Sequence, residues 1–517
     1  MTPVKIVLLM LLLQPYLFAA DPTSFANHYL KSQANKDGPD FIQHKKAGPG
    51  WFSNLGPTGI RALLTDENGK AEWEGQGSRY LVKYVFPKSP ASRKITPGDI
   101  ILGVNGERFK STYTFGYWFG WGYDGPITEV GAEVERAEKE NKGRMNFLVL
   151  RKGKEIEVNI TIKKKGVFTE NFPYKCKKSS ALKKEALLWL LKNQKADGKW
   201  PGQGHASMIA CLALLAQGKR YLSSVDKHLK NIEFNDHTWN WSLAIYGIIM
   251  SEYTLMTRKK TYYKKMQQIN DYFVSNQKRF KNSAFGHEGK SGSQGYGPMS
   301  SITGLVCLSW ALLEKCKIKI NQEAYMKTLI TMDMELVRND GDSKSGDFGY
   351  GWPNKGVKVY DFKPEQVTPA LGELEADIEN FNQDRAAGIP KAMMAITHSI
   401  RPWQDYSANV ATHHINKITK TRRCLVTGHG SGIMHAWACF LALGQASNLG
   451  NSKPLQLSLE ANKNLINSAR CFDGSFYTQP QRDDFGGDLN RGSRTTATAM
   501  WLTMLSIPEK ELIILGK

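Results

Sequence analysis

The chain has 517 residues, 41% of them hydrophobic, and a formal net charge of +21. This composition is that of a globular protein, and the length leaves room for two or three domains with a sizeable core. The charge favours anionic partners such as acidic polysaccharide, cell-envelope polymer, phospholipid headgroups or nucleic acid. A basic surface without a dedicated ligand explains it equally well.

The first 20 residues have the pattern of a secretory signal peptide. Lys5 precedes an apolar run at 6–13, and Ala19 and Ala20 offer a cleavage site. The run is too short to span a bilayer, and no later run approaches about 20 apolar residues, so we expect no transmembrane segment. These features predict an exported protein, periplasmic or extracellular, and argue against nucleic acid as a partner.

The sequence pattern changes at residue 50, after a polar leader at 21–49. The motif SPA at 89–91 is followed by ITPGDIILGVNG at 95–106. A strand (RYLVKYVF), an amphipathic helix (ITEVGAEVERAEKEN) and a hairpin turning at Lys152-Gly153 flank this motif. Residues 50–165 closely resemble a PDZ domain, a small mixed β/α fold.

The resemblance to PDZ domains implies a peptide or protein partner, bound by β-augmentation with its carboxylate held by a glycine-rich loop. The matching loop departs from the usual pattern and comprises Leu55, Gly56, Pro57, Thr58, Gly59 and Ile60. An aromatic, glycine-rich insert occupies 113–125. Two hypotheses remain open for it, a platform for sugars or peptides and a cover over the neighbouring domain.

A linker at 166–179 leads into helical repeats that run from 180 to 517. A turn with glycine and an aromatic residue precedes a nearly continuous apolar helix, as at DGKW (197–200) before ASMIACLALLAQ, and the unit returns along the chain. Such a unit cannot bury its apolar face alone. The pattern predicts helices at 180–193, 205–217, 221–233, 238–255, 261–276, 298–314, 321–337, 389–400, 432–445, 455–469 and 493–506, with insertions at 338–388 and 401–430.

About six pairs of outer and inner helices indicate a closed, all-α toroid of the (α/α)6 type. The turns DGKW (197–200) and DGSF (473–476) resemble those of the squalene cyclase and protein prenyltransferase superfamily. The combination of signal peptide, PDZ domain and toroid resembles a group of exported bacterial proteins of unestablished function. The sequence therefore predicts a multidomain protein.

Cysteines fall at matching places in three apolar helices, at Cys211, Cys307 and Cys439, with Met500 at that place in a fourth. A cysteine on an apolar helix face is usually a small core residue. Cys176, Cys424 and Cys471 lie near expected loops, where pairing in an oxidising compartment stays open.

Inner-helix N-termini of a toroid open onto one central cavity, so residues beside them are the candidates for chemistry. Histidine, tyrosine and arginine in one basin would suit proton transfer on an anionic substrate. The catalytic candidates are His205, His287, Tyr350, His429, His435 and Arg494; Glu288, Tyr296, Asp347, Asp488 and Arg491 lie beside them.

Several sharper motifs are missing from the sequence. The DxDD acid motif of the cyclases is absent, and the Cys and His residues do not form a convincing zinc set, so we expect no metal and no cofactor. The sequence contains no nucleotide-binding loop.

Three hypotheses about function follow. In the first, the toroid acts on or binds an anionic ligand, possibly an acidic polysaccharide; as a lyase it would use His429 or His435 with Tyr350 and Arg494. In the second, the protein is a non-enzymatic scaffold or binding protein. Terpenoid cyclisation or prenyl transfer, which the superfamily resemblance implies, is the third.

Overall fold

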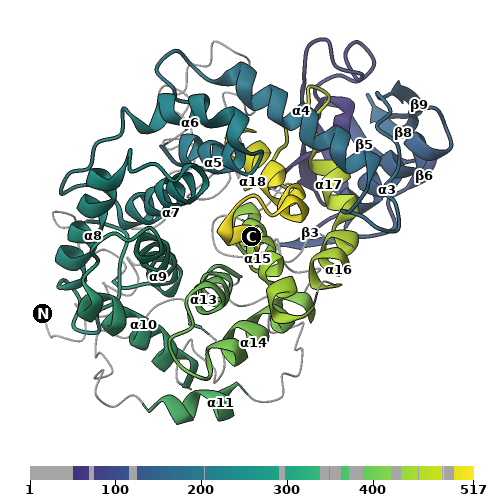
Figure 1. Ribbon diagram of the computed structural model, residues 1–517. Helices are drawn as coiled ribbons and strands as arrows, with labels where there is room; N and C mark the ends of the chain where they lie inside the picture. The colour runs from purple at the N-terminus through teal and green to yellow at the C-terminus, as the bar shows by residue number, and fades with distance from the viewer. Residues whose placement is uncertain are drawn as a thin grey trace, which may run out of the picture.

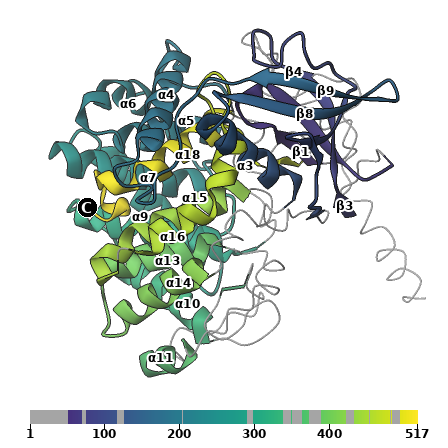
Figure 2. The same ribbon diagram turned by 90° about the vertical axis from the view of Figure 1, so that its right-hand side faces the viewer.

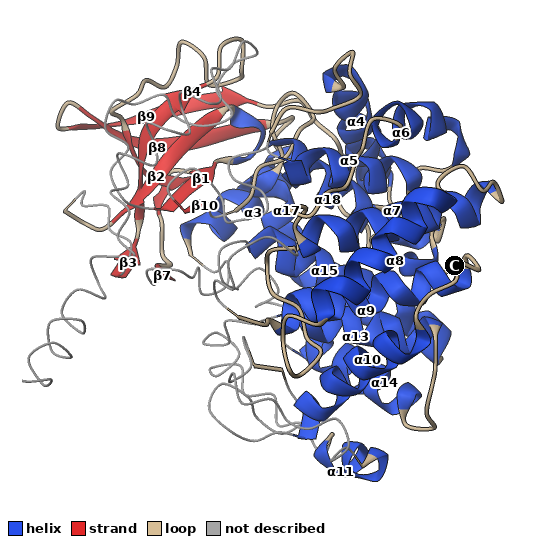
Figure 3. Cartoon of the chain, turned by 90° about the vertical axis from the view of Figure 1, so that its left-hand side faces the viewer, coloured by secondary structure: helices blue, strands red, loops and turns tan. Residues whose placement is uncertain are grey.

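The computed structural model combines an antiparallel β-sheet near the N-terminus with a large helical region (Figures 1 and 3). It describes residues 51–68, 75–115, 125–202, 204–289, 297–337, 348–349, 363–371, 388–420, 432–451, 453–479, 481–482 and 494–517. The predicted signal peptide, the leader and most of the aromatic insert lie outside these residues. The chain is a multidomain protein of mixed β and α structure. None of the described helices is both long and apolar enough to cross a membrane.

The sheet is built from strands that pair antiparallel throughout. Its strand order is β10-β1-β2-β4-β5-β8-β9, with bounds Gln481–Arg482, Trp51–Asn54, Ile60–Thr65, Arg79–Val85, Ile100–Val104, Arg144–Arg151 and Lys154–Thr161. Short β6 (Glu107–Arg108) pairs with β5, and β3 (Gly75–Gly77) pairs with β7 (Tyr113–Phe115). We call residues 51–161 the sheet module.

Helix α3 (Pro126–Lys139) supplies Val130 and Val134 to the sheet module's core. The predicted strands, helix and hairpin of this module are confirmed. The hairpin turns at Lys152 and Gly153, which both have positive φ, the conformation that a two-residue turn of the I′ type requires.

The helical region has an inner and an outer set of helices, visible in Figure 1. The described inner helices are α5 (Gly204–Leu215), α7 (Asn240–Thr257), α9 (Ser300–Lys315), α13 (Gly388–Ile400), α15 (Gly432–Gln445) and α18 (Arg494–Leu505). Each contacts the next, and α18 contacts α5. The outer ones are α4 (Lys177–Asn193), α6 (Leu222–Leu229), α8 (Tyr263–Gln277), α10 (Gln322–Val337), α14 (Ser407–Lys420), α16 (Lys453–Ala461) and α17 (Lys463–Ala469). We call these helices the helical ring.

Apolar composition explains which helices lie inside. Every residue of α18 is buried, as is every residue of α9 from Ser300 to Leu313. The outer helix α8 buries one face, with Met266, Ile269 and Phe273 recurring at the helical period.

The repeat is visible in hydrogen bonds between a turn and the inner helix that follows it. A backbone N–H donates to a Ser or Thr hydroxyl in the pairs Trp200–Ser207 (3.0 Å), Phe285–Thr303 (3.0 Å) and Phe476–Thr498 (2.9 Å). Cys211 and Cys307 come four residues after these hydroxyls. In α18 the residue four positions after Thr498 is Leu502. Leu502, and not Met500, therefore occupies the place that corresponds to the cysteines.

The structure differs from the sequence prediction at two helices. Helix α14 lies within the stretch 401–430 that we expected to be an insertion, and the single helix expected at 455–469 is two, α16 and α17. Cys211, Cys307 and Cys439 are buried, as predicted. Cys176 and Cys471 are buried and unpaired, and Cys424 lies outside the described residues.

Candidate functional site

Two histidine candidates lie beside the first turns of inner helices, His205 in α5 itself and His287 against the first turn of α7. His205 is half-buried on α5. His287, before α9, accepts a hydrogen bond at Nδ1 from the indole Nε1 of Trp241, 2.8 Å away, which places the proton of a neutral ring on Nε2. The ring of Trp239 lies 5.8 Å from that of His287, and this tryptophan is 46% exposed.

Arg494 begins α18 and is held by surrounding groups. Its Nη1 donates to Oδ2 of Asp473 at 2.8 Å, and its guanidinium lies 5.2 Å from the Phe86 ring and 5.4 Å from the Trp189 ring. Burial alone would raise the pKa of Asp473, but Arg494 and the hydrogen bonds from Ser475 hold it below the usual range. Arg494 therefore already neutralises a carboxylate of this chain.

The catalytic candidates belong to different parts of the helical ring. His435 is buried on α15, while Tyr350 and His429 lie outside the described residues. The four described candidates come from α5, the turn before α9, α15 and α18. Among the inner helices, α7 lies between α5 and α9, because it contacts both. Their assignment to one basin stays a prediction.

The sequence analysis missed a buried polar trio. Oδ1 of Asp333 on α10 is 2.9 Å from Nε2 of His398 on α13, and Oδ2 accepts a 2.6 Å hydrogen bond from the Tyr406 hydroxyl. Burial and the Asp333 charge raise the pKa of Tyr406. The three side chains are buried, so the trio ties helices together. Among the described residues, no three His, Cys, Asp or Glu side chains are grouped to hold a metal ion.

The expected peptide-binding loop lies in the interior. Leu55, Gly56, Pro57, Thr58, Gly59 and Ile60 are all buried. Helix α17 of the helical ring contacts both α3 and the short 3-10 helix Gly56–Thr58 inside this loop. The loop is a contact between the sheet module and the helical ring, and its expected role in binding a peptide carboxylate stays a prediction.

The chain also occupies the strand edges beside this loop. β1 pairs antiparallel with β2, and β10, which comes from the C-terminal part of the chain, pairs with the other edge of β1. The Nδ2 of Asn54 donates to the carbonyls of Ser468 and Arg470, at 2.8 and 2.9 Å, and its backbone N–H donates to Gln479 Oε1. This is β-augmentation by the same chain.

A buried ion network completes the junction. Lys178 is fully buried, lies 2.7 Å from Glu138 Oε2 and also pairs with Glu135, while Arg470 lies 2.6 Å from Glu138 Oε1. Asn467 donates to Glu135 at 2.8 Å. Both acids belong to α3 and the other three residues to helical segments, so charge fixes how the two parts meet.

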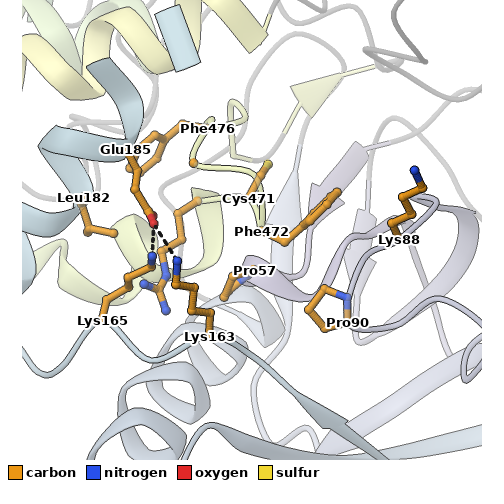
Figure 4. Close-up of a pocket in the computed structure, with 12 residues that line it drawn as sticks. Pro57, Lys88, Pro90, Lys163, Lys165, Leu182, Glu185, Cys471, Phe472 and Phe476 are labelled. Atoms are coloured by element: carbon orange, nitrogen blue, oxygen red, sulfur yellow. Dashed lines mark hydrogen bonds and ion pairs between the residues drawn. The ribbon is translucent and has the colours of Figure 1, made fainter. Parts of the chain in front are cut away.

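A pocket of about 220 Å³ opens at this junction (Figure 4). Residues from the sheet module, from 163–165, from α4 and from the segment after α17 line it. They divide into cations (Lys88, Lys163, Lys165, Arg470), one carboxylate (Glu185) and apolar or small groups (Pro57, Pro90, Leu182, Cys471, Phe472, Gly474, Phe476). Figure 4 shows Lys163 and Lys165 together at Glu185, with Lys88 apart from them beside Pro90.

Comparison with known families gives one partial match. A family model described as a domain of unknown function, DUF6288, matches residues 183–347, which span α5, α7, α9 and the helices between them. No curated protein and no solved structure matches the chain significantly.

Proposed function

We propose that this chain is an exported, non-enzymatic binding protein for an anionic ligand, built from a PDZ-like module and an (α/α)6-type toroid. Each inner helix contacts the next and the last contacts the first, which supports a closed toroid. The strand–loop–strand arrangement of β1 and β2 with α3 beside it supports the PDZ-like module. Export rests on the signal-peptide pattern at 1–20.

The observation that carries this proposal is the burial of the expected peptide loop. A PDZ-like module whose loop contacts α17 and whose first strand is paired with β10 uses its peptide-binding surface within the chain. The module then joins the protein together, and the ligand must be bound elsewhere.

The choice of an anionic ligand, with acidic polysaccharide first, rests on the net charge of +21. Binding without turnover is favoured because Arg494, the candidate for neutralising substrate charge, is engaged by Asp473. An enzyme that cleaves acidic polysaccharide is the alternative, supported by His287 beside the exposed Trp239, since aromatic faces suit sugar rings.

The test is titration calorimetry of the full chain with acidic oligosaccharides and their neutral counterparts, while ultraviolet absorbance follows new unsaturated uronates. We expect saturable binding of the acidic set without product. Product formation would establish the enzyme instead, and a lack of binding to every acidic oligosaccharide would refute the proposal.

A further inference from the structure

The junction pocket differs from the rest of the basic surface because cations and aromatic rings meet there in a concave space. Four of its lining residues are cationic and one is acidic. Glu138 lies behind Arg470 and balances it, and Glu185 pairs with Lys163 and Lys165. An excess of positive charge therefore remains among the lining residues, and concave walls of low polarity concentrate such a field.

The lysines differ in their freedom to reach a ligand. The Lys163 side chain is 80% exposed, whereas that of Lys165 is 12% exposed and that of Arg470 only 3%. Lys88 is exposed and stands on a turn with φ of 62°. The exposed ammonium groups suit a carboxylate, because a flexible lysine side chain can move its N–H groups into position for a charge-assisted hydrogen bond. The largely buried Lys165 and Arg470 stay in place.

The apolar lining indicates what must accompany the carboxylate. Phe472 and Pro90 are partly exposed and provide apolar surface next to the cations, while Phe476 and Pro57, which also line the pocket, are buried. A sugar ring has an apolar face that packs on such surfaces while its substituents hydrogen-bond at the edge. The volume of about 220 Å³ lies below the roughly 300 Å³ at which pockets for drug-sized ligands begin, so one small ring fits.

A peptide carboxylate is less suited to this place. Peptides that add to sheets need an open strand edge, and beside the pocket β1 is paired on one side with β2 and on the other with β10. The pocket thus offers charge and apolar surface without a backbone ladder.

We propose that the junction pocket is a binding site for a single uronic acid unit of an acidic polysaccharide. Lys163 contacts the carboxylate, Phe472 packs against the ring, and Lys88, on the other side of Phe472, adds positive charge to the pocket. This inference rests on the proposed function, because it names the place and the sugar class at which the anionic ligand is held.

The experiment compares two double variants of the full chain by calorimetry with oligogalacturonate. Lys88→Glu with Lys163→Glu reverses the pocket charges. Lys317→Glu with Lys319→Glu makes the same change in net charge on exposed lysines after α9, and Lys317, with φ of 63°, matches the backbone conformation of Lys88. We expect an affinity loss of about tenfold or more for the pocket variant and less than about threefold for the matched variant.

Each other outcome overturns part of the argument. Equal losses in the two variants would show binding to the overall charge, and unchanged affinity in the pocket variant would place the site elsewhere; both reject the pocket and leave the proposed function standing. Binding of carboxyl-reduced oligosaccharide as tight as that of oligogalacturonate would reject the uronate. Binding of a peptide with a free carboxyl end in place of the sugar would reject the ligand class. Wild-type protein that binds no acidic oligosaccharide refutes the proposed function itself.

Discussion

The centre of the helical ring and the junction with the sheet module are both buried, but they are held by different forces. The ring buries Trp310, Trp437 and Trp501 together with many aliphatic side chains. The junction buries Lys178, Arg470 and their carboxylate partners. Apolar packing is non-directional and supplies stability, whereas paired charges permit one relative placement only. The contrast implies that the ring provides most of the stability, and that the junction determines how the sheet module is placed on the ring.

The largest effect that tests this contrast comes from Lys178→Ala, which removes the fully buried cation between Glu135 and Glu138 and leaves Glu138 with Arg470 as its remaining ion-pair partner. We expect the free energy of unfolding to fall by about 3–5 kcal/mol, measured by urea denaturation. The control is Lys183→Ala on the same helix, whose partner Glu509 is 42% exposed, with an expected loss of at most about 1 kcal/mol. Similar losses in both variants would contradict the role given to the buried network.

A second pair of variants compares backbone packing in the two regions. A Cβ at Gly131 of α3 would lie 2.0 Å from the carbonyl oxygen of Asn464, whereas at Gly304 of α9 the nearest atom is the Met393 Cβ at 3.2 Å. Gly131→Ala should cost about 3 kcal/mol because backbone must shift, and Gly304→Ala about 1 kcal/mol. Thermal unfolding measures both, and a larger loss at Gly304 would reverse the expected order.

The ring contributes a pH dependence through His228, which is buried on α6 with Nε2 3.0 Å from the Tyr246 hydroxyl. Burial, with the nearby Lys199 charge, lowers its pKa from 6.5 to about 4. The unfolded chain takes up this proton first, so the contribution is complete above pH 6.5 and is lost as pH falls toward 4.

We expect acidification through this window to remove about 3 kcal/mol of the free energy of unfolding through this histidine. In His228→Gln the loss of stability between neutral and acid pH should be smaller by that amount, as measured by denaturation at several pH values. Parallel pH profiles for wild type and variant would show that His228 does not titrate in this way.

A smaller effect than those of Lys178→Ala, Gly131→Ala and His228→Gln is expected for the polar trio inside the ring. Tyr406→Phe removes the hydroxyl that donates to Asp333 and leaves His398 as the other partner of that carboxylate. We expect a loss of about 1.5 kcal/mol in the free energy of unfolding. A loss as large as that of Lys178→Ala would show that directional polar contacts matter as much inside the ring as at the junction.

The sequence predicts elements well where one physical signal dominates. Apolar runs preceded by glycine turns located the inner helices to within a few residues, and the Lys152-Gly153 turn located the hairpin. Helix α14 was missed because its buried face includes His413 and His414. These two polar residues interrupt the apolar periodicity by which a helix is recognised in a sequence. Patterning cannot reveal a helix whose buried face is partly imidazole.

The candidate site depends on contacts between distant segments, which periodicity does not contain. The sequence of the loop Leu55–Ile60 suggested a carboxylate-binding loop and gives no sign of its contact with α17. The junction pocket combines residues near 57, 88, 163, 185 and 472, and no local motif links them. The run of three lysines at 163–165 is a local signal of positive charge, but it does not indicate which segments lie opposite it.

The pairing of β1 with β10 joins two strands that are made at different times during synthesis. Synthesis starts at the N-terminus, so β1 is made long before β10. Until β10 has been made, the outer edge of β1 lacks this partner, and an open strand edge is a template for association with other chains. Pairing with β10 closes this edge of β1 and so removes a place at which copies of the protein could associate before folding is complete.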